Sequence, residues 1–410
     1  MTRDQEIVKQ LQQRLPGWNP DGRCTFPFHG HERCCEYDEQ GRLIKLHSCR
    51  LGLAQIPSEI WQFSALQDLS LSGNQLGTLP AEVGNLTSLQ SLNLVSCHLS
   101  TLPAEVGNLT SLQSLNLIEN QLSTLPAEMG QLTALRELSL DNNQLSTLPA
   151  AVCQLTALQR LHLSRNQLST LPAEIGQLTS LRELHLDNNQ FSTLPAAVCQ
   201  LTALLGLHLD GNQLGTLPAE MGQLTALRVL HLDNNPLQSP LPDIIAQGIF
   251  TLLAYLRTLQ PVKIFYCYAH EDRDLRDRID KHLAGLKRRG HIVVWYDREI
   301  QAGKEWEHEI EKHLSTAGII LLLVSANFMD SDYCYGKEMQ KALEMHEQGK
   351  VRVIPILLRP VDWQDAPFAK LQILPTGAKP ITIWPDQDEA LEDVAQQIRA
   401  VVTTLRTYKS

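Results

Sequence analysis

Four histidines recur every 23 residues along the middle of this 410-residue chain: His162, His185, His208 and His231. An aspartate lies two residues after each of the last three, namely Asp187, Asp210 and Asp233. Imidazoles change charge near neutral pH, and neighbouring carboxylates favour the charged form whereas neighbouring imidazoles oppose it. The spacing therefore predicts a polar strip that responds to pH, with the sign of the net pKa shift left open. Flat columns of donors do not converge on one ion, so we predict no metal site there.

This spacing belongs to a longer repeat, in which one slot is an asparagine in seven copies and a cysteine in one. The slot falls at Asn74, Cys97, Asn120, Asn143, Asn166, Asn189, Asn212 and Asn235. The surrounding pattern is LxxLxLxxNxLxxLP, and leucines two residues apart put their side chains on one face of a short strand. A proline at a fixed place keeps the return side irregular. Residues 43–240 thus resemble a leucine-rich-repeat solenoid, a curved parallel β array of about nine repeats.

The residues between the strand leucines face the concave side of such a solenoid. Because adjacent strands lie about 4.8 Å apart, the four histidine rings are predicted to stack as a ladder. We predict that an unknown protein or other ligand binds this face. Recent duplication of one repeat would produce the same columns without any selection for binding, and this alternative stays open.

Both ends of the array are predicted to carry caps. Residues 1–42 contain a short helix and a cluster of cysteine and histidine residues that includes Cys24, His29 and His31. Its spacing fits no established zinc signature, which favours buried thiols and leaves zinc binding open. Residues 241–260 are predicted to form an amphipathic capping helix and linker that ends before Pro261.

Composition restricts the function. The formal net charge of -10 argues against general nucleic-acid binding, which needs a basic face. The first residues lack the apolar region of a secretory signal, and no apolar stretch is long enough to span a membrane. The nine scattered cysteines indicate reduced thiols. We therefore expect a cytoplasmic protein, with delivery into a host cell as an alternative.

From residue 262 the pattern changes to alternating strands and helices. VKIFYCYAH, HIVVWYD, GIILLLVS, VRVIPILL and PITIW are predicted strands, with helices at 273–289, 304–315, 335–347 and 389–405. This alternation predicts a doubly wound α/β domain over 261–410, with a five-stranded parallel sheet in flavodoxin-like order.

Several motifs of this region resemble those of TIR domains, in the same order along the chain. They are KIFYCYAHEDRD, WYDREIQAGKEWEHEIEKHL, GIILLLVSANFMDSDYCYGKEMQKAL and VIPILLRPVDW. Many TIR domains, bacterial ones especially, cleave NAD to nicotinamide and ADP-ribose or a cyclic form of it. The resemblance implies NAD as substrate, with no metal, cofactor or covalent cysteine required.

The resemblance maps the catalytic glutamate of the family onto Glu338. A carboxylate near the ribose would stabilise an oxocarbenium-like transition state. Further candidate NAD contacts are Tyr268, His270, Asp297, Arg298, Tyr333 and Tyr335. Either Tyr333 or Tyr335, together with Tyr268, is the predicted aromatic wall, because Cys334 stands where catalytic TIR domains often carry tryptophan.

Other TIR domains act only by assembling with one another. A non-catalytic adaptor or effector that works through TIR–TIR contacts therefore remains the alternative to an NAD hydrolase. The sequence contains no phosphate-binding G-x-x-x-x-G-K-[ST] loop, so assembly is predicted to come from the repeats, the cap or TIR self-association.

Overall fold

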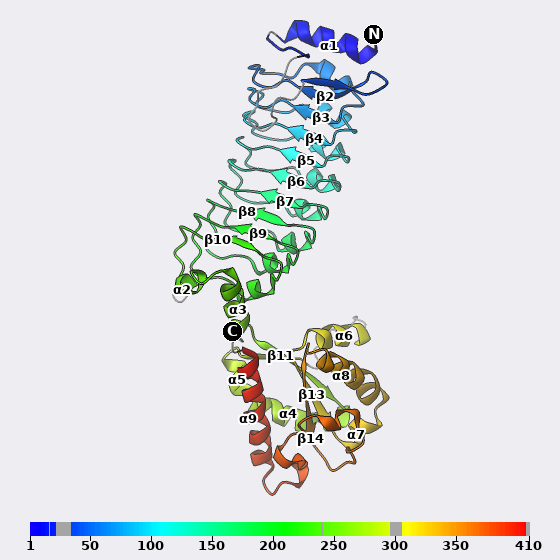
Figure 1. Cartoon of the computed structure of the whole chain (residues 1–410), viewed down its shortest axis with the longest axis vertical. Helices are drawn as coiled ribbons and strands as arrows, with labels where there is room; N and C mark the ends of the chain where they lie inside the picture. The colour runs from blue at the N-terminus through cyan, green and yellow to red at the C-terminus, as the bar shows by residue number, and fades with distance from the viewer. Residues whose placement is uncertain (16, 22–33, 239–240, 296–305, 407–410) are drawn as a thin grey trace. The chain divides into compact units, whose positions relative to one another are not determined.

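The computed structural model describes residues 1–15, 17–21, 34–238, 241–295 and 306–406 (Figure 1). The chain divides into two compact units, Met1–Leu256 and Arg257–Ser410. The first unit has one continuous hydrophobic core, and the second has two, one on each face of its sheet. No helix among the described residues is long and apolar enough to cross a membrane.

The first unit, the repeat unit, is built on a sheet of ten short strands that follow one another in chain order (Figure 1). Only the first pair, β1 (Cys35–Tyr37) and β2 (Leu43–His47), is antiparallel. The parallel strands that follow are β3 (Asp68–Ser70), β4 (Ser91–Asn93), β5 (Ser114–Asn116), β6 (Glu137–Ser139), β7 (Arg160–His162), β8 (Glu183–His185), β9 (Gly206–His208) and β10 (Val229–His231). Helix α1 (Arg3–Arg14) contributes Ile7, Val8 and Leu11 to the core of this unit.

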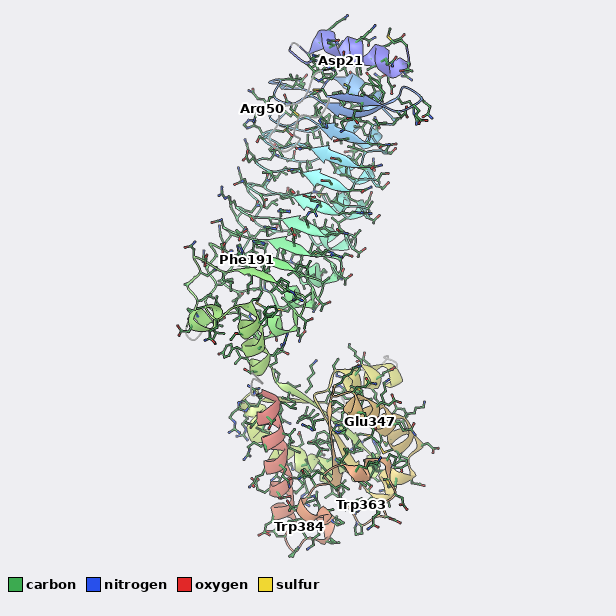
Figure 2. The ribbon with its side chains drawn as sticks, viewed as in Figure 1. Asp21, Arg50, Phe191, Glu347, Trp363 and Trp384 are labelled. Carbon is green, nitrogen blue, oxygen red and sulfur yellow. The ribbon has the colours of Figure 1, made fainter. Side chains whose placement is uncertain are left out.

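On the return side each repeat makes a short 3-10 helix after its proline, as the irregular pattern predicts. These helices are η1 (Ser58–Gln62), η2 (Ala81–Asn85), η3 (Ala104–Asn108), η4 (Ala127–Gln131), η5 (Ala150–Gln154), η6 (Ala173–Gln177), η7 (Ala196–Gln200) and η8 (Ala219–Gln223). The leucines of both sides fill the space between strand and helix. Phe191 takes the place of one of these leucines and is fully buried (Figure 2).

The asparagine slot ties each repeat to the one before it. The Nδ2 of Asn143 donates to the carbonyls of Leu117 and Leu140 at 2.9 and 3.0 Å, and its Oδ1 accepts from the amide of Leu122 at 3.0 Å. The buried amide of Leu122, which would otherwise lack a partner, is thereby satisfied, and each carbonyl accepts from the asparagines of two neighbouring repeats. At Cys97 the thiol donates to the carbonyl of Leu71 at 3.2 Å, which replaces one of these bonds.

The repeat unit ends in two short helices, α2 (Leu241–Ile245) and α3 (Ile249–Leu259), rather than one continuous capping helix. Gly248 separates them with a φ of 102°, a conformation that interrupts a right-handed helix and that glycine adopts without strain. Leu252, Leu253 and Leu256 of α3 then close the core.

The second unit, the C-terminal unit, has four parallel strands in the order β12-β11-β13-β14. They are β11 (Val262–Tyr268), β12 (Ile292–Trp295), β13 (Ile319–Val324) and β14 (Arg352–Leu357). This confirms the predicted doubly wound sheet, and the strand order is that of the flavodoxin-like class. The longer helices are α4 (Arg273–His282), α5 (Ala284–Arg288), α6 (Trp306–Thr316), α7 (Ala326–Asp330), α8 (Met339–Glu347) and α9 (Gln387–Arg406).

The two faces of this sheet pack against different helices. Ile264, Tyr266 and Tyr268 of β11 belong to the core that includes residues of α4 and α9, whereas Phe265 and Cys267 belong to the core that includes residues of α6 and α8. This division follows from the alternation of side chains along a strand.

The predicted fifth strand, residues 380–384, is wrong. This segment is a 3-10 turn, η14 (Ile381–Ile383), so the described C-terminal unit has four strands. Pro380 has no N–H to give to a sheet, and the amides of Ile383 and Trp384 bond back to Pro380 and Ile381. Only the amide of Thr382 reaches towards the sheet, where it donates to the carbonyl of Leu358.

Candidate functional site

A cavity of about 390 Å³ opens at the carboxyl ends of β11 and β12. Binding sites of doubly wound sheets lie at this edge, and the volume is within the range of small-molecule pockets. The residues that matter most to its chemistry are Tyr268, His270, Trp295, Tyr333, Cys334 and Glu338. Four of the predicted contacts, Glu338, Tyr268, His270 and Tyr333, therefore line one cavity.

Glu338 lies at the end of a π-helical turn, η11 (Asp332–Glu338), directly before α8. Ser331 caps this turn by accepting a hydrogen bond from the amide of Cys334 at 3.2 Å. Such wide turns within helices are frequent at functional sites, because they re-aim side chains. The side chain of Glu338 is only 7% exposed, and the thiol of Cys267 donates to its Oε2 at 2.8 Å.

Cys267, which lies beside Glu338, is held as a neutral thiol. Burial raises the pKa of Cys267 well above its usual range, and contacts with Cys334 and Glu338 raise it further. The thiol of Cys334 donates to the carbonyl of Tyr268 at 3.4 Å. Because a thiolate is the nucleophilic form, this environment makes Cys267 a poor nucleophile.

The predicted aromatic residues divide between the cavity and the core. Tyr333 lines the cavity, with the Nζ of Lys337 5.7 Å from its ring centroid. Tyr335 packs edge-on against Phe328 and is outside the cavity lining. The ring of Tyr268 belongs to the core on the α4 and α9 side, where the guanidinium of Arg276 lies 5.0 Å from it. Tyr333 is thus the better candidate for the aromatic wall.

Trp295 is an aromatic lining residue that the sequence analysis missed. It ends β12, and its ring stacks between Phe265 and His313 at centroid distances of 5.3 and 4.3 Å. The sequence feature that could have indicated Trp295 as a lining residue is its position at the carboxyl end of a predicted strand that lies next to the first strand of the sheet.

His270 follows β11 in η9 (His270–Asp272) and is exposed. The guanidinium of Arg273 donates to its Nδ1 at 3.2 Å. Asp297 and Arg298, also predicted contacts, lie outside the described residues, as do Cys24, His29 and His31 of the N-terminal cap.

A buried carboxylate supports the turn that carries His270. Asp272 is fully buried and accepts a hydrogen bond from the Nε of Arg359 at 3.0 Å and another from the hydroxyl of Ser325. These contacts join the loops that follow β11, β13 and β14. No local pattern in the sequence indicates this group, because its members come from three segments that are far apart in the chain.

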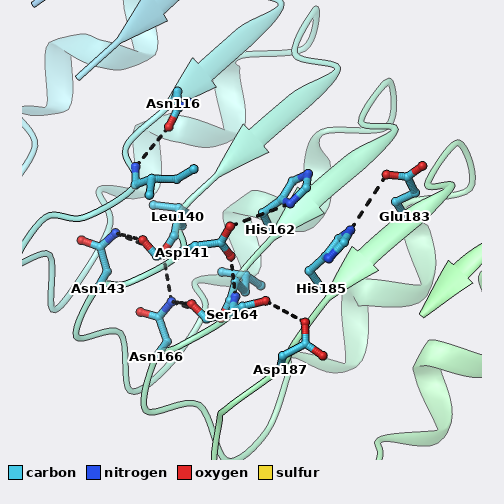
Figure 3. Close-up of polar contacts among 12 residues, drawn as sticks. Asn116, Leu140, Asp141, Asn143, His162, Ser164, Asn166, Glu183, His185 and Asp187 are labelled. Atoms are coloured by element: carbon cyan, nitrogen blue, oxygen red, sulfur yellow. Dashed lines mark hydrogen bonds and ion pairs between the residues drawn. The ribbon is translucent and has the colours of Figure 1, made fainter. Parts of the chain in front are cut away.

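The histidine column forms on the strands of the repeat unit, as predicted. The rings of His162 and His185 stack 4.3 Å apart at 13°, and those of His185 and His208 stack 4.0 Å apart at 9°. The ring of His231 is tilted by 59° to that of His208. Figure 3 shows two ion-pair contacts of this column, His162 with Asp141 and His185 with Glu183, both at 3.9 Å.

The pKa values of three histidines of this column are lowered, which settles the direction that the sequence left open. Burial is the main cause for His162, His185 and His208, and repulsion by its two neighbours adds to it at His185, whose pKa falls to about 4. The three rings are therefore neutral at neutral pH.

The aspartate column has a structural role of its own. Oδ1 of Asp187 accepts from the amide of Asp210 at 3.0 Å, and Oδ1 of Asp210 accepts from the amide of Asp233 at 2.7 Å. Asp141 accepts in the same way from the amide of Ser164 at 2.6 Å (Figure 3). Each carboxylate thus satisfies a backbone group of the next repeat, which accounts for the column without a ligand.

Comparison with known proteins agrees with these two units. A family model described as a leucine-rich repeat region matches residues 31–147 and 149–327. The chain belongs to the leucine-rich-repeat family. A TIR-domain model matches residues 264–397. The two matches overlap over 264–327, and we assign the overlap to the TIR domain because the last repeat strand, β10, ends at His231.

This leucine-rich-repeat protein is 52% identical over 136 residues to the uncharacterized protein y4lF of Sinorhizobium fredii. The match covers 33% of the chain and 42% of y4lF, so the chain spans less than half of that relative. A leucine-rich-repeat protein of Leptospira interrogans is similar in structure, with a TM-score of 0.36, 32% identity, and coverage of 47% of this chain and 67% of the other. For the plant peptide hormone receptor RGFR1 the TM-score is 0.42 and the identity 28%, with coverage of 52% and 41%.

Proposed function

We propose that the TIR domain cleaves the bond between nicotinamide and ribose in NAD, with Glu338 as the catalytic carboxylate. The observation that carries this proposal is a nearly buried carboxylate in a cavity at the carboxyl edge of the sheet. A volume of about 390 Å³ is near the lower limit for a small-molecule site, so we place the nicotinamide ribose half of NAD there.

The reaction requires few catalytic groups from the protein. Nicotinamide leaves as a neutral molecule from a cationic pyridinium, so the leaving group needs no acid. Positive charge develops on the ribose, and the nearly buried carboxylate of Glu338 stabilises it. Attack by water gives ADP-ribose, and attack by a nitrogen of the adenine gives a cyclic product.

The surrounding side chains would orient the substrate. Tyr333 offers an aromatic surface on which a nicotinamide ring can stack, and the ring of Trp295, held between Phe265 and His313, forms another part of the cavity lining. Holding the ring against such a wall fixes the bond to be broken beside Glu338, which lowers the entropic part of the barrier.

The repeats would supply regulation. We propose that a protein or other ligand binds their concave face and that TIR domains then associate to complete the active form. NAD serves as substrate in this scheme, and the chemistry requires no further cofactor.

Release of nicotinamide from NAD by the purified full-length chain, measured by chromatography at several protein concentrations, tests the proposal. We expect Glu338→Gln to lower the rate at least about a hundredfold, since it removes the charge that the transition state needs. Glu347→Gln is the matched control, because Glu347 is an exposed glutamate of α8 (Figure 2) and its loss should leave the rate unchanged.

The second candidate is an adaptor that acts through TIR–TIR contacts alone. The absence of tryptophan at position 334 favours it, since Cys334 removes one of the family's usual aromatic surfaces. Under this alternative the chain self-associates in sedimentation experiments while NAD stays intact at every concentration, and Glu338→Gln has no effect on association.

A further inference from the structure

The repeat unit contains a group of donors that the NAD chemistry does not use. His162 lies on β7, and Glu183 and His185 lie two residues apart on the same face of the neighbouring strand β8 (Figure 3). One ligand atom from each of the three residues can be chosen so that all lie within 4.8 Å of one another. A single column of the repeat pattern does not reveal this group, because its donors come from two columns and two strands.

We propose that His162, Glu183 and His185 bind one divalent transition-metal ion of the Zn²⁺ class on the concave face of the repeats. Two imidazoles and a carboxylate suit such borderline ions, and three protein donors leave a fourth position for water or for a donor from a bound partner. This site is separate from the TIR domain and independent of the function proposed for it.

The Nε2 of His162 is available as a metal ligand. The Nε2 of His162 is buried and has no hydrogen-bond partner among the described residues, whereas its Nδ1 faces Oδ2 of Asp141 at 3.9 Å. A proton on Nδ1, on the side of the ring that faces Asp141, leaves the lone pair on Nε2. This is the arrangement in which a carboxylate behind a histidine orients it towards a metal.

Glu183 is also placed to serve. The neighbour of Glu183 in the same column, Arg160, forms an ion pair at 2.5 Å with Glu137 on the preceding strand. The carboxylate of Glu183 therefore remains available to interact with His185. The residue beyond Glu183 in the same column is Gly206, which has no side chain to fill the space there. The Oε2 of Glu183 lies 3.9 Å from the Nε2 of His185.

A second group, His185 with Asp187 and His208, meets the same distance limit but is less suitable. Both oxygens of Asp187 are already occupied, Oδ1 by the amide of Asp210 and Oδ2 by the hydroxyl of Ser164 at 3.1 Å. A neutral imidazole has one lone pair, so the two groups cannot share His185 at the same time. We therefore expect one ion per chain in this column.

Binding requires one ring to turn. The rings of His162 and His185 are nearly parallel, and because a lone pair lies in the plane of its ring, parallel rings cannot both point at one ion. Rotation about the Cβ–Cγ bond meets a shallow barrier, and both side chains are about one-fifth exposed on the concave face. Binding of the ion would thus break the stacking contact between His162 and His185 and form one coordinate bond to each of them.

Titration of the tag-free, reduced full-length chain with Co²⁺, followed by absorption spectroscopy, tests this proposal, with Zn²⁺ added afterwards as competitor. We expect visible bands of nitrogen and oxygen coordination that saturate at one equivalent and vanish when Zn²⁺ is added. His162→Gln, Glu183→Gln and His185→Gln should each weaken binding at least about tenfold, and Asp141→Asn should weaken it by about tenfold through loss of orientation.

Two controls keep the assignment falsifiable. His231→Gln removes a histidine of the same column that belongs to neither group, and Asp187→Asn removes a ligand of the second group, so both should bind Co²⁺ like the wild type. Hydrogen exchange of each variant shows that its repeats are folded. The proposal is wrong if Glu183→Gln binds normally, if Asp187→Asn alone loses binding, or if the only bands are those of thiolate coordination.

Discussion

At the scale of single residues, the TIR cavity brings together a carboxylate and two thiols with different access to solvent. Cys267 is fully buried, and its pKa is raised by burial and by its neighbours, whereas Cys334 lies half-buried in the cavity lining. Reactivity follows the accessible thiolate, so these two cysteines should behave differently towards an alkylating reagent.

We expect iodoacetamide to modify Cys334 well before Cys267 in the folded protein, as measured by mass spectrometry of the peptides that carry each residue. The adduct fills part of the cavity, so nicotinamide release should fall as Cys334 is modified, and NAD should slow the modification. Cys334→Ser should make the activity resistant to the reagent. Faster labelling of Cys267 than of Cys334 would contradict the burial on which this prediction rests.

The histidine column makes the stability of the repeats depend on pH. In the metal-free protein His185 has a pKa of about 4, below the value of about 6.5 in an unfolded chain, so the unfolded state binds the proton first. Stability is therefore unaffected above about pH 6.5 and falls as the pH decreases from there to about 4. Because His185 is only half-buried, solvent screening reduces the loss that the full shift would give, and we expect a loss of about 1 kcal/mol at pH 5.

Hydrogen exchange of the β7 to β9 amides, corrected for the intrinsic rates and measured with EDTA near pH 7.5 and pH 5, checks this effect. His185→Gln should lose about 1 kcal/mol less stability than the wild type between the two pH values. The raised pKa of Asp141 acts in the opposite direction, because a folded state that takes up a proton more readily gains stability as the pH falls. Equal losses in both proteins would show that His185 does not cause the dependence.

Prediction of the site from sequence succeeded where periodicity determines position. The 23-residue period and the strand spacing together place His162, His185 and His208 in one stack. Tyr268 lines the cavity, but family position does not show which face of β11 its ring occupies; the alternation of side chains along the strand places it on the face opposite to Cys267. The direction in which Glu338 points depends on the π turn before it, and no local pattern in the sequence indicated that turn.

At the scale of elements, the asparagine slot is the feature that stabilises the array most directly. In Asn143→Ala the amide of Leu122 loses its partner inside the protein, whereas the carbonyls of Leu117 and Leu140 keep a second donor, the Nδ2 of Asn120 and that of Asn166. A buried donor left unpaired costs about 1–3 kcal/mol, so we expect a loss in that range. Hydrogen exchange of β5 and β6 measures it.

Gln144→Ala provides the control for Asn143→Ala. Gln144 is the exposed neighbour, and only its backbone amide is bonded, to the carbonyl of Leu122 at 2.9 Å. We expect its exchange pattern to match the wild type. If the two variants behave alike, the asparagine side chain contributes less than its hydrogen bonds suggest.

The elements were predictable from the sequence to the extent that their patterns are local. Strands of the repeats follow from leucines two residues apart, and the four strands of the TIR domain follow from continuous apolar runs. The segment 380–384 has the same apolar character, but Pro380 and the turn that follows use its amides locally. The break at Gly248 was missed because a helical pattern of apolar residues continues through it.

At the scale of the whole molecule, the hydrophobic cores of the described residues do not cross from one unit to the other. Units with separate cores commonly unfold in separate steps. We therefore expect scanning calorimetry of the full chain to show two transitions. Asn143→Ala should lower only the transition of the repeats. Ile320→Ala, which empties a fully buried position of β13, should lower only that of the TIR domain, by about 2–5 kcal/mol.

The same experiment shows where NAD binds, if Glu338→Gln is used to prevent its consumption. A ligand that binds only the folded state raises the transition of the unit that holds it, by about 2.7 kcal/mol at a hundred times its Kd. NAD should therefore raise the TIR transition and leave that of the repeats unchanged, whereas Zn²⁺ should do the reverse. A single transition, or variants that lower both transitions together, would show that the two units fold as one, and regulation would then act through shared stability rather than through association of TIR domains.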